Sequence, residues 1–406
     1  MKIQTGEGTT IPLITLIGIW SISALNALPG LAVSPILGKL SVIFPHSSEL
    51  DIQMLTSLPS LLIIPFIILS GKLTEKVNNI LLLQLGLVIF ALSGVLYLLS
   101  TKMWQLVAVS ALLGVGSGLI VPLSTGLISR FFSGAYRTKQ FGYSSAITNL
   151  TLVIATVVTG YLAEVDWHLP FVVYLLPIVS IVLSFYLKKN IAPLPPDDKM
   201  SGGSYPAVPG LKPGKHGIEV RKLVTLMGFY GLVTFLALIV SFNLPFLMKE
   251  YHFTSGNSGT MISLFFLAIM APGLFLDKIV DKLGTMTNFY SLLSIALGLF
   301  LILIAPTEWV IGPGCILTGL GYGVLQPVVY DKTTRTAIHK KVTMALACVM
   351  AMNYLAILLC PFILSFVADL FDAKSQQFPF IFNLVITLAA MVWAYTKCNA
   401  FLSNNE

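Results

Sequence analysis

Apolar residues follow one another in long uninterrupted runs along this chain, and short polar segments separate the runs. About 20 apolar residues are enough for a helix to cross the hydrocarbon core of a bilayer. Membrane-spanning strands alternate in polarity and are about half as long, so these runs predict helices. The first half predicts six helices, at 11–33, 53–70, 79–99, 104–127, 141–162 and 169–187. The second half predicts six more, at 223–247, 259–276, 285–304, 309–329, 342–367 and 378–395.

A polar segment rich in proline and glycine, at 189–222, separates the two sets of helices. Such a composition is typical of a linker. We therefore expect a six-helix bundle at 1–188, a linker at 189–222 and a second six-helix bundle at 223–406.

The chain also contains an internal repeat. Three glycines and a proline recur 205 positions later, as Gly114, Gly116, Gly118 and Pro122 and then as Gly319, Gly321, Gly323 and Pro327. The recurrence indicates two copies of one six-helix unit. Rows of small residues allow neighbouring helices to approach closely. We expect these two glycine-rich helices, each with a proline at the same depth, to be where the two moving halves meet.

Composition and charge agree with a membrane protein. Apolar residues make up 56% of the chain and charged residues 10%, whereas a soluble domain has about a quarter charged residues. The net charge is +7, but the basic residues flank apolar runs instead of gathering on a polar domain, which argues against a nucleic-acid partner. With both ends on one side, that side holds 20 of the 24 lysines and arginines. This excess predicts that the termini and the linker are cytoplasmic.

Cysteine and histidine give no sign of a metal site, a cofactor or an enzyme. The four cysteines, at 315, 348, 360 and 398, lie in or beside apolar runs without CxxC spacing. They are typical of small apolar residues in helix packing. The five histidines are scattered over different loops, so no catalytic cluster is predicted.

Six plus six helices, a cytoplasmic linker and an acidic-basic pair after the second and eighth helices resemble the major facilitator superfamily. The motif of that family is G-x-L-x-D-R-x-G-R-R. Gly71, Leu73, Glu75 and Lys76 match it in kind, and the second copy keeps Asp281, Lys282 and Gly284. The resemblance implies an all-α membrane protein with 12 transmembrane helices in two pseudo-symmetric six-helix bundles.

The resemblance also implies a gating role for these loop charges. The loop carboxylate in that family pairs with cationic groups on the cytoplasmic side and stabilises the outward-open state. The resemblance implies that Glu75 pairs with Arg130 or Arg137, and that Asp281 pairs with Arg335 or a neighbour. Lys76 and Lys282 lie in the same two loops. The alternative is that they are solvated loop charges.

Neutral polar side chains are the candidates for substrate contact, because no charged residue lies deep in a predicted helix. A buried amide or phenol costs about 1–3 kcal/mol unless it is hydrogen-bonded, so such residues hold helices together or meet a ligand. In the resembled family, helices 1, 4, 7 and 10 line the cavity. The candidates are Asn26, Asn149, Tyr230, Asn243, Tyr322, Gln326 and Asn353.

Sequence spacing says more about two pairs of these candidates. Tyr322 and Gln326 are one turn apart on one face of the tenth helix, which is the leading candidate for substrate contact. Asn26 and Asn243 each precede a proline, which predicts a break in the first and seventh helices beside the cavity.

Proton coupling has one candidate, Asp331, at the cytoplasmic end of the tenth helix. Burial would raise its pKa and make it a proton site, and the alternative is an interfacial carboxylate beside Lys332. The chain departs from proton-coupled drug exporters at Ser110, where they carry an arginine, and in the fifth helix, which lacks their proline.

Together these features predict a secondary active transporter of an amphipathic or hydrophobic organic compound. The loop pattern and the sixth helix, with PFVVYLLPIVS at 170–180, resemble those of drug exporters, which favours export across a bacterial cytoplasmic (inner) membrane. We expect a monomer. An importer or facilitator of a small metabolite is the alternative. The expected partners are a small organic substrate, the lipid bilayer and, if Asp331 titrates, protons.

Overall fold

The computed structural model describes residues 2–6, 9–73, 78–132, 134–190, 219–304, 306–334, 336, 342–373 and 375–396. Most of these residues lie in helices, and the start of the chain forms an antiparallel hairpin made of β1 (Lys2–Gly6) and β2 (Thr9–Pro12). The sequence predicted no element at 2–6 and placed Ile11 in the first helix, which was wrong. A hairpin forms there because alternating side chains pack inward: Thr5 and Ile11 are buried.

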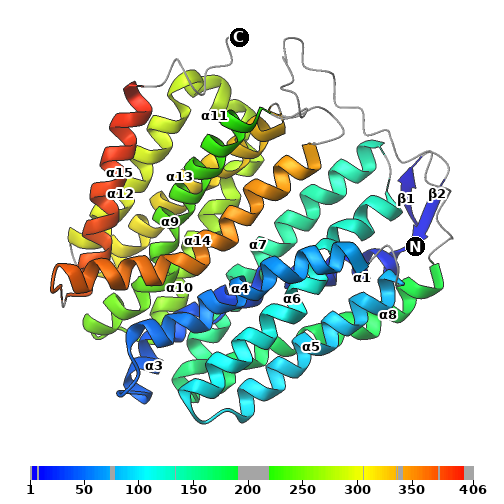
Figure 1. Ribbon diagram of the computed structural model, residues 1–406, viewed down its shortest axis with the longest axis horizontal. Helices are drawn as coiled ribbons and strands as arrows, with labels where there is room; N and C mark the ends of the chain where they lie inside the picture. The colour runs from blue at the N-terminus through cyan, green and yellow to red at the C-terminus, as the bar shows by residue number, and fades with distance from the viewer. Residues whose placement is uncertain are drawn as a thin grey trace.

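The first half of the chain lies together on one side of the molecule and the second half on the other (Figure 1). The helices of the first half are α1 (Leu13–Leu25), α2 (Leu28–Leu31), η1 (Ser34–Ile36), α3 (Leu37–Ile43), α4 (Glu49–Leu73), α5 (Asn79–Leu99), α6 (Met103–Phe131), α7 (Gly134–Val165), η2 (Leu169–Leu175) and α8 (Pro177–Asn190). Those of the second half are α9 (Val220–Glu250), α10 (Ser255–Met270), η4 (Ala271–Leu274), α11 (Leu276–Leu283), η5 (Gly284–Met286), α12 (Thr287–Ile304), α13 (Glu308–Thr334), α14 (Val342–Leu370) and α15 (Phe378–Thr396).

Nine of the described helices are long and apolar enough to cross a membrane, or ten if the bent pair α1 and 28–43 counts as one span. This confirms the helical membrane class. α10 and α13, which correspond to two predicted spans, lie outside that set, so the count of twelve stays a prediction.

The first predicted helix is broken, as Asn26 and Pro29 led us to expect. α1 ends at Leu25, and the chain then bends by 43° and continues through α2 and η1 to Ile43. Gly30 adopts a φ of +83°, and a Cβ there would overlap the carbonyl oxygen of Thr56. The break thus lets the backbone of this segment touch α4, an approach that only glycine allows.

The seventh predicted helix is not broken, so that expectation was wrong. α9 runs without interruption from Val220 to Glu250 and contains both Asn243 and Pro245. A proline near the end of a long helix removes a single backbone hydrogen bond, and the tightly buried surroundings hold the helix together.

The glycine-rich helices pack within each half, not between the halves. A Cβ at Gly114 or Gly118 would overlap α4, and one at Gly116 would lie 2.8 Å from the backbone nitrogen of Phe90 in α5. In the second half, Gly319 and Gly323 meet α10 in the same way, and Gly321 meets α12. The expectation that the moving halves meet along these glycines was therefore wrong.

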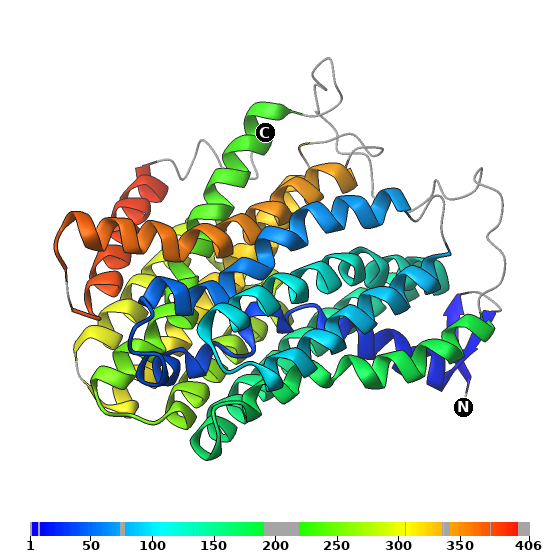
Figure 2. The same ribbon diagram turned by 60° about the horizontal axis from the view of Figure 1, so that its bottom comes forward.

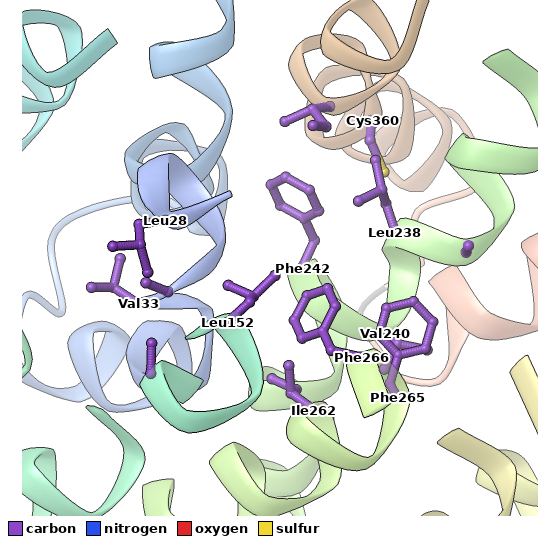
Figure 3. Close-up of a cluster of buried hydrophobic side chains, with 14 of the residues drawn as sticks. Leu28, Val33, Leu152, Leu238, Val240, Phe242, Ile262, Phe265, Phe266 and Cys360 are labelled. Carbon is purple, nitrogen blue, oxygen red and sulfur yellow. The ribbon is translucent and has the colours of Figure 1, made fainter. Parts of the chain in front are cut away.

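The halves meet instead through α7 against α10, α4 beside α14, and α3 with η1 against α9. Figure 2 shows α4, in blue, running beside α14, in orange. Buried apolar side chains from both halves form a continuous cluster (Figure 3). It includes Leu28, Val33 and Leu152 of the first half and Phe242, Ile262 and Phe266 of the second.

Two ends of the molecule are distinguished below. The linker end is the end at which α8 finishes at Asn190 and α9 begins at Val220, and the far end is the opposite one. The hydrogen bonds between the halves that the structure describes all lie at the far end, and they join Ser41 to Lys249, Glu49 to Gln376 and Glu164 to Gly256. The far end is closed in this structure.

Candidate functional site

A cluster of phenols and amides lies between α9, α13 and α14. The hydroxyl of Tyr230 on α9 shares a 2.9 Å hydrogen bond with Tyr330 and a 3.4 Å contact with Tyr322, both on α13. The amide nitrogen of Gln326 donates to Tyr230 at 3.2 Å and to Tyr330 at 3.4 Å. Three of these four residues stand on one face of α13, because positions 322, 326 and 330 are successive turns apart.

The cluster extends to α14 and further along α9. The hydroxyl of Tyr322 donates to Oδ1 of Asn353 at 3.5 Å and lies 3.4 Å from the hydroxyl of Thr234. Tyr230 is fully buried, whereas Gln326, Tyr330 and Asn353 are partly exposed. The cluster therefore has a buried base at Tyr230 and a partly open rim made of neutral donors and acceptors.

The first half holds a smaller polar set on the corresponding helices. The amide nitrogen of Asn26, at the end of α1, donates to Oγ of Ser124 on α6 at 2.9 Å. Closer to the linker end, the indole nitrogen of Trp20 donates to Oε1 of Gln140 on α7 at 3.0 Å. Each half thus has a polar bond between the two helices that were predicted to line the path, α1 with α6 and α9 with α13.

The structure brings together four of the seven predicted substrate residues: Tyr230, Tyr322, Gln326 and Asn353. Asn149 is half-buried and donates to the carbonyl oxygen of Ser145 in its own helix, α7. Asn243 is buried 13 residues beyond Tyr230 on α9, which is about 20 Å away along the helix. Asn243 therefore lies outside the cluster.

Sequence reasoning missed several members of these sets. Tyr330 is one of the neutral polar residues that the sequence places along the path, but it was left out of the predicted substrate set although it is four residues after Gln326 on the same helical face. Thr234 had a weaker signal of the same kind, one turn after Tyr230. Ser124 and Gln140 gave no signal, since their partners Asn26 and Trp20 are about 100 residues away in the sequence.

The predicted gating residues are only partly described. Asp281 and Lys282 are exposed on α11, a short helix at the linker end. α6 includes Arg130 and α7 includes Arg137, but neither side chain is among the described parts, and Glu75, Lys76 and Arg335 lie outside the described residues. The pairing of these charges stays a prediction.

Asp331 follows Tyr330 directly, in the last turn of α13. Its backbone therefore lies next to the rim of the cluster on the side of the linker end, while its side chain is outside the described part of the structure. Among the described residues, no group of three or more His, Cys, Asp or Glu side chains could hold a metal ion.

A surface hollow of about 350 Å³ lies over the contact between the halves at the closed far end. Its walls come from both halves, and they include two lysines, one carboxylate and the first turn of α10. The lining residues are Pro35, Gly38, Lys39, Val42, Glu164, Pro245, Lys249, Phe253, Thr254, Ser255 and Ser258.

Comparison with known proteins places this arrangement among transporters. A family model described as Major Facilitator Superfamily matches residues 13–337. The quinolone resistance protein NorA of Staphylococcus aureus (strain MRSA252) is 24% identical over 280 residues, which cover 67% of this chain and 69% of that protein. The multidrug transporter protein MdtP of Bacillus subtilis (strain 168) is 28% identical over 118 residues, which cover 29% of this chain and 22% of that protein.

Solved structures share the fold at low sequence identity. The nucleoside transporter NupG superposes with a TM-score of 0.74 at 11% identity, covering 94% of this chain and 99% of that one. A bacterial homolog of the human lysosomal transporter Spinster, in an inward-facing and unoccupied conformation, gives a TM-score of 0.64 at 13% identity and covers 96% and 95% of the two chains.

Proposed function

This chain belongs to the major facilitator superfamily, and on that premise we propose that it is a secondary active exporter of amphipathic or hydrophobic organic compounds. The observation that carries the proposal is the cluster around Tyr230, which offers hydrogen bonds and aromatic surface without a charged side chain among its described members. A multiply charged solute would lose its water there without a counter-ion, which is expensive. The names of the relatives NorA and MdtP, a resistance protein and a multidrug transporter, support export.

The proposed binding site lies between the halves and is made of residues from both. Tyr322, Gln326 and Asn353 would contact the polar part of a substrate, with Tyr230 holding the first two in place. Asn26 and Asn149 would contribute from the first half. Asn243 is left out of the proposed site because of its distance along α9.

The linker end is proposed to face the cytoplasm of a bacterial cell, with the protein in the cytoplasmic membrane. The excess of lysine and arginine on that side supports this orientation. The closed far end is then the outer end, and alternating access requires the halves to separate there. Glu75, Lys76, Arg130, Arg137, Asp281, Lys282 and Arg335 are proposed to close the cytoplasmic end in the opposite state.

Proton coupling is proposed to use Asp331, because its position beside Tyr330 would let its charge affect the cluster. An ionisable group beside a substrate site is the usual route by which a proton gradient drives transport. The matching variant is Asp331→Asn, which keeps the size of the side chain and removes its charge.

The test uses inside-out membrane vesicles and a panel of fluorescent amphipathic cations, neutral compounds and small polar metabolites. We expect amphipathic compounds to accumulate when the lumen is acidic and to stop accumulating when an ionophore collapses the gradient. In Asp331→Asn, accumulation should fall to the level that the parent protein reaches with ionophore present. Movement of substrate down its own concentration gradient should continue. Accumulation that is unchanged when the pH gradient is collapsed would overturn proton coupling. Transport of polar metabolites alone would favour the alternative, an importer.

A further inference from the structure

A carboxylate of the first half rests on the end of a helix of the second half. Glu164 lies in the last turn of α7, and its Oε1 accepts a 2.9 Å hydrogen bond from the backbone N–H of Gly256. Gly256 is the second residue of α10, whose N-cap Thr254 accepts from the backbone N–H of Asn257. Glu164 therefore satisfies one of the first-turn N–H groups that have no partner within the helix.

The contact depends on glycine. A Cβ at Gly256 would overlap Oε1 of Glu164 and lie 2.7 Å from ring carbons of Tyr161. One turn away, a Cβ at Gly160 would lie 2.6 Å from the carbonyl oxygen of Ser255, and one at Gly259 would overlap the carbonyl oxygen of Thr156. α7 and α10 thus touch backbone to backbone at the far end. The hydrogen bond from Gly256 to Glu164 lies at the end of this helix contact.

The carboxylate of Glu164 lies among positively charged groups at the far end. The first turn of a helix carries partial positive charge. Lys39 and Lys249 line the same hollow as Glu164. Lys39 donates to the carbonyl oxygen of Ala163, and Lys249 donates to Oγ of Ser41 at 2.9 Å. The charge of Lys39 also acts on Asp166 and that of Lys249 on Glu49, so both lysines are shared among the carboxylates of this end.

We propose that Glu164 is the latch of the far end: its carboxylate on the N-terminus of α10 holds the two halves together there and stabilises the far-end-closed state. The bond exists only while α7 and α10 are in contact, because the two helices belong to different halves. Removing it shifts the equilibrium toward the far-end-open state by the differential stabilisation that it supplied. A charge at a helix end corresponds to about a twofold to tenfold change in such an equilibrium.

The experiment measures how readily a reagent enters from the far end. Ser258 lines the hollow and is buried, so a cysteine there reports opening. Ser258→Cys is made in a background whose four native cysteines are replaced, and whole cells are treated with a membrane-impermeant maleimide. We expect Glu164→Ala to label about three to ten times faster than its parent and Glu164→Gln to show a smaller increase, since the amide keeps a hydrogen bond but loses the charge.

Two further variants decide between a latch and a general surface effect. Asp166→Asn removes a carboxylate two residues away whose hydrogen bonds, among the described residues, are to the backbone N–H of His168 at 2.7 Å and to its ring at 2.9 Å; it should leave the rate unchanged. Gly256→Ala displaces the carboxylate while Glu164 is still present and should raise the rate like Glu164→Ala. An unchanged rate in well-folded Glu164→Ala or Glu164→Gln, or an equal increase in Asp166→Asn, would overturn the latch.

The readout is independent of what the protein transports. Labelling of Ser258→Cys needs no substrate, so a failure of the proposed export function and a failure of the latch give different results. Labelling of the denatured protein to completion confirms that the introduced thiol is reactive in each variant.

Discussion

The side chain of Tyr230 is fully buried on the membrane-spanning helix α9, so bulk water cannot replace a lost partner of its hydroxyl. It bonds to Tyr330 at 2.9 Å and Gln326 at 3.2 Å and touches Tyr322 at 3.4 Å, so one oxygen atom links α9 to three successive turns of α13. Loss of that oxygen leaves several polar groups short of a partner in a site of low polarity. The cost is therefore larger than that of one exposed hydrogen bond.

Tyr230→Phe should lower stability and weaken substrate binding together. We expect a loss of about 1–3 kcal/mol, seen as a lower Tm of the purified protein in detergent. The control is Tyr354→Phe: Tyr354 lies on α14 next to Asn353 and makes no hydrogen bond among those the structure describes. Equal Tm values for the two variants would contradict the role given to the Tyr230 hydroxyl.

Single residues were predictable where their partners share a helix. Tyr322 and Gln326 were found from their spacing, and both belong to the cluster. Asn243 was misplaced because its neighbour Pro245 suggested a break, whereas the buried surroundings keep α9 continuous. The bond between Trp20 and Gln140 could not be predicted, since spacing within a helix says nothing about a residue 120 positions away.

At the scale of helices, the glycines of α6 set how closely it approaches its neighbours. A Cβ at Gly114 would overlap the carbonyl oxygen of Pro59 and lie 2.8 Å from its Cα, and neither backbone atom can turn away as a side chain could. Gly126, on the same helix, has no atom of a neighbouring element within 4 Å of the corresponding position. The same substitution at these two sites therefore separates helix packing from helix propensity.

Gly114→Ala should destabilise the first half, and Gly126→Ala should not. Forcing α6 away from α4 costs about 1–3 kcal/mol, while alanine in place of an unconstrained helical glycine stabilises by about 1 kcal/mol or less. Thermal unfolding of the two purified variants beside the parent measures both effects. A Tm for Gly114→Ala at or above that of Gly126→Ala would show that α6 is not packed as described.

The elements were predictable to different degrees. The repeat of three glycines indicated close packing correctly but could not say against what, because small residues suit contacts within a half and between halves equally well. The break after α1 was predicted from Asn26 and the proline that follows it, Pro29. The hairpin β1–β2 was not expected, since its strands are four or five residues long and precede a strong helical signal.

At the scale of the whole molecule, the sequence repeat is symmetric but the structure is closed at one end. Which end is closed follows from contacts between the halves, such as Lys249 with Ser41, and these residues have no counterpart in the repeat pattern. A chain of two similar halves has two such states, and its sequence must be compatible with both. The closed end could therefore not be read from the repeat.

Holding the far end closed should stop transport but leave substrate binding intact. Oε1 of Glu49 in the first half accepts a 2.6 Å hydrogen bond from the amide of Gln376 in the second, so cysteines at 49 and 376 can be joined by a short reducible cross-linker. We expect transport in vesicles to fall to background and to return with reductant, because the halves must separate here once per cycle.

The control joins 376 to 250: Glu250 accepts from the backbone N–H of Gln376 within the same half. The 376–250 bridge uses the same cross-linker but lies within one half, so the halves can still separate and transport should continue. Transport that survives the 49–376 bridge, or that both bridges stop equally, would mean that the far end does not open between the halves.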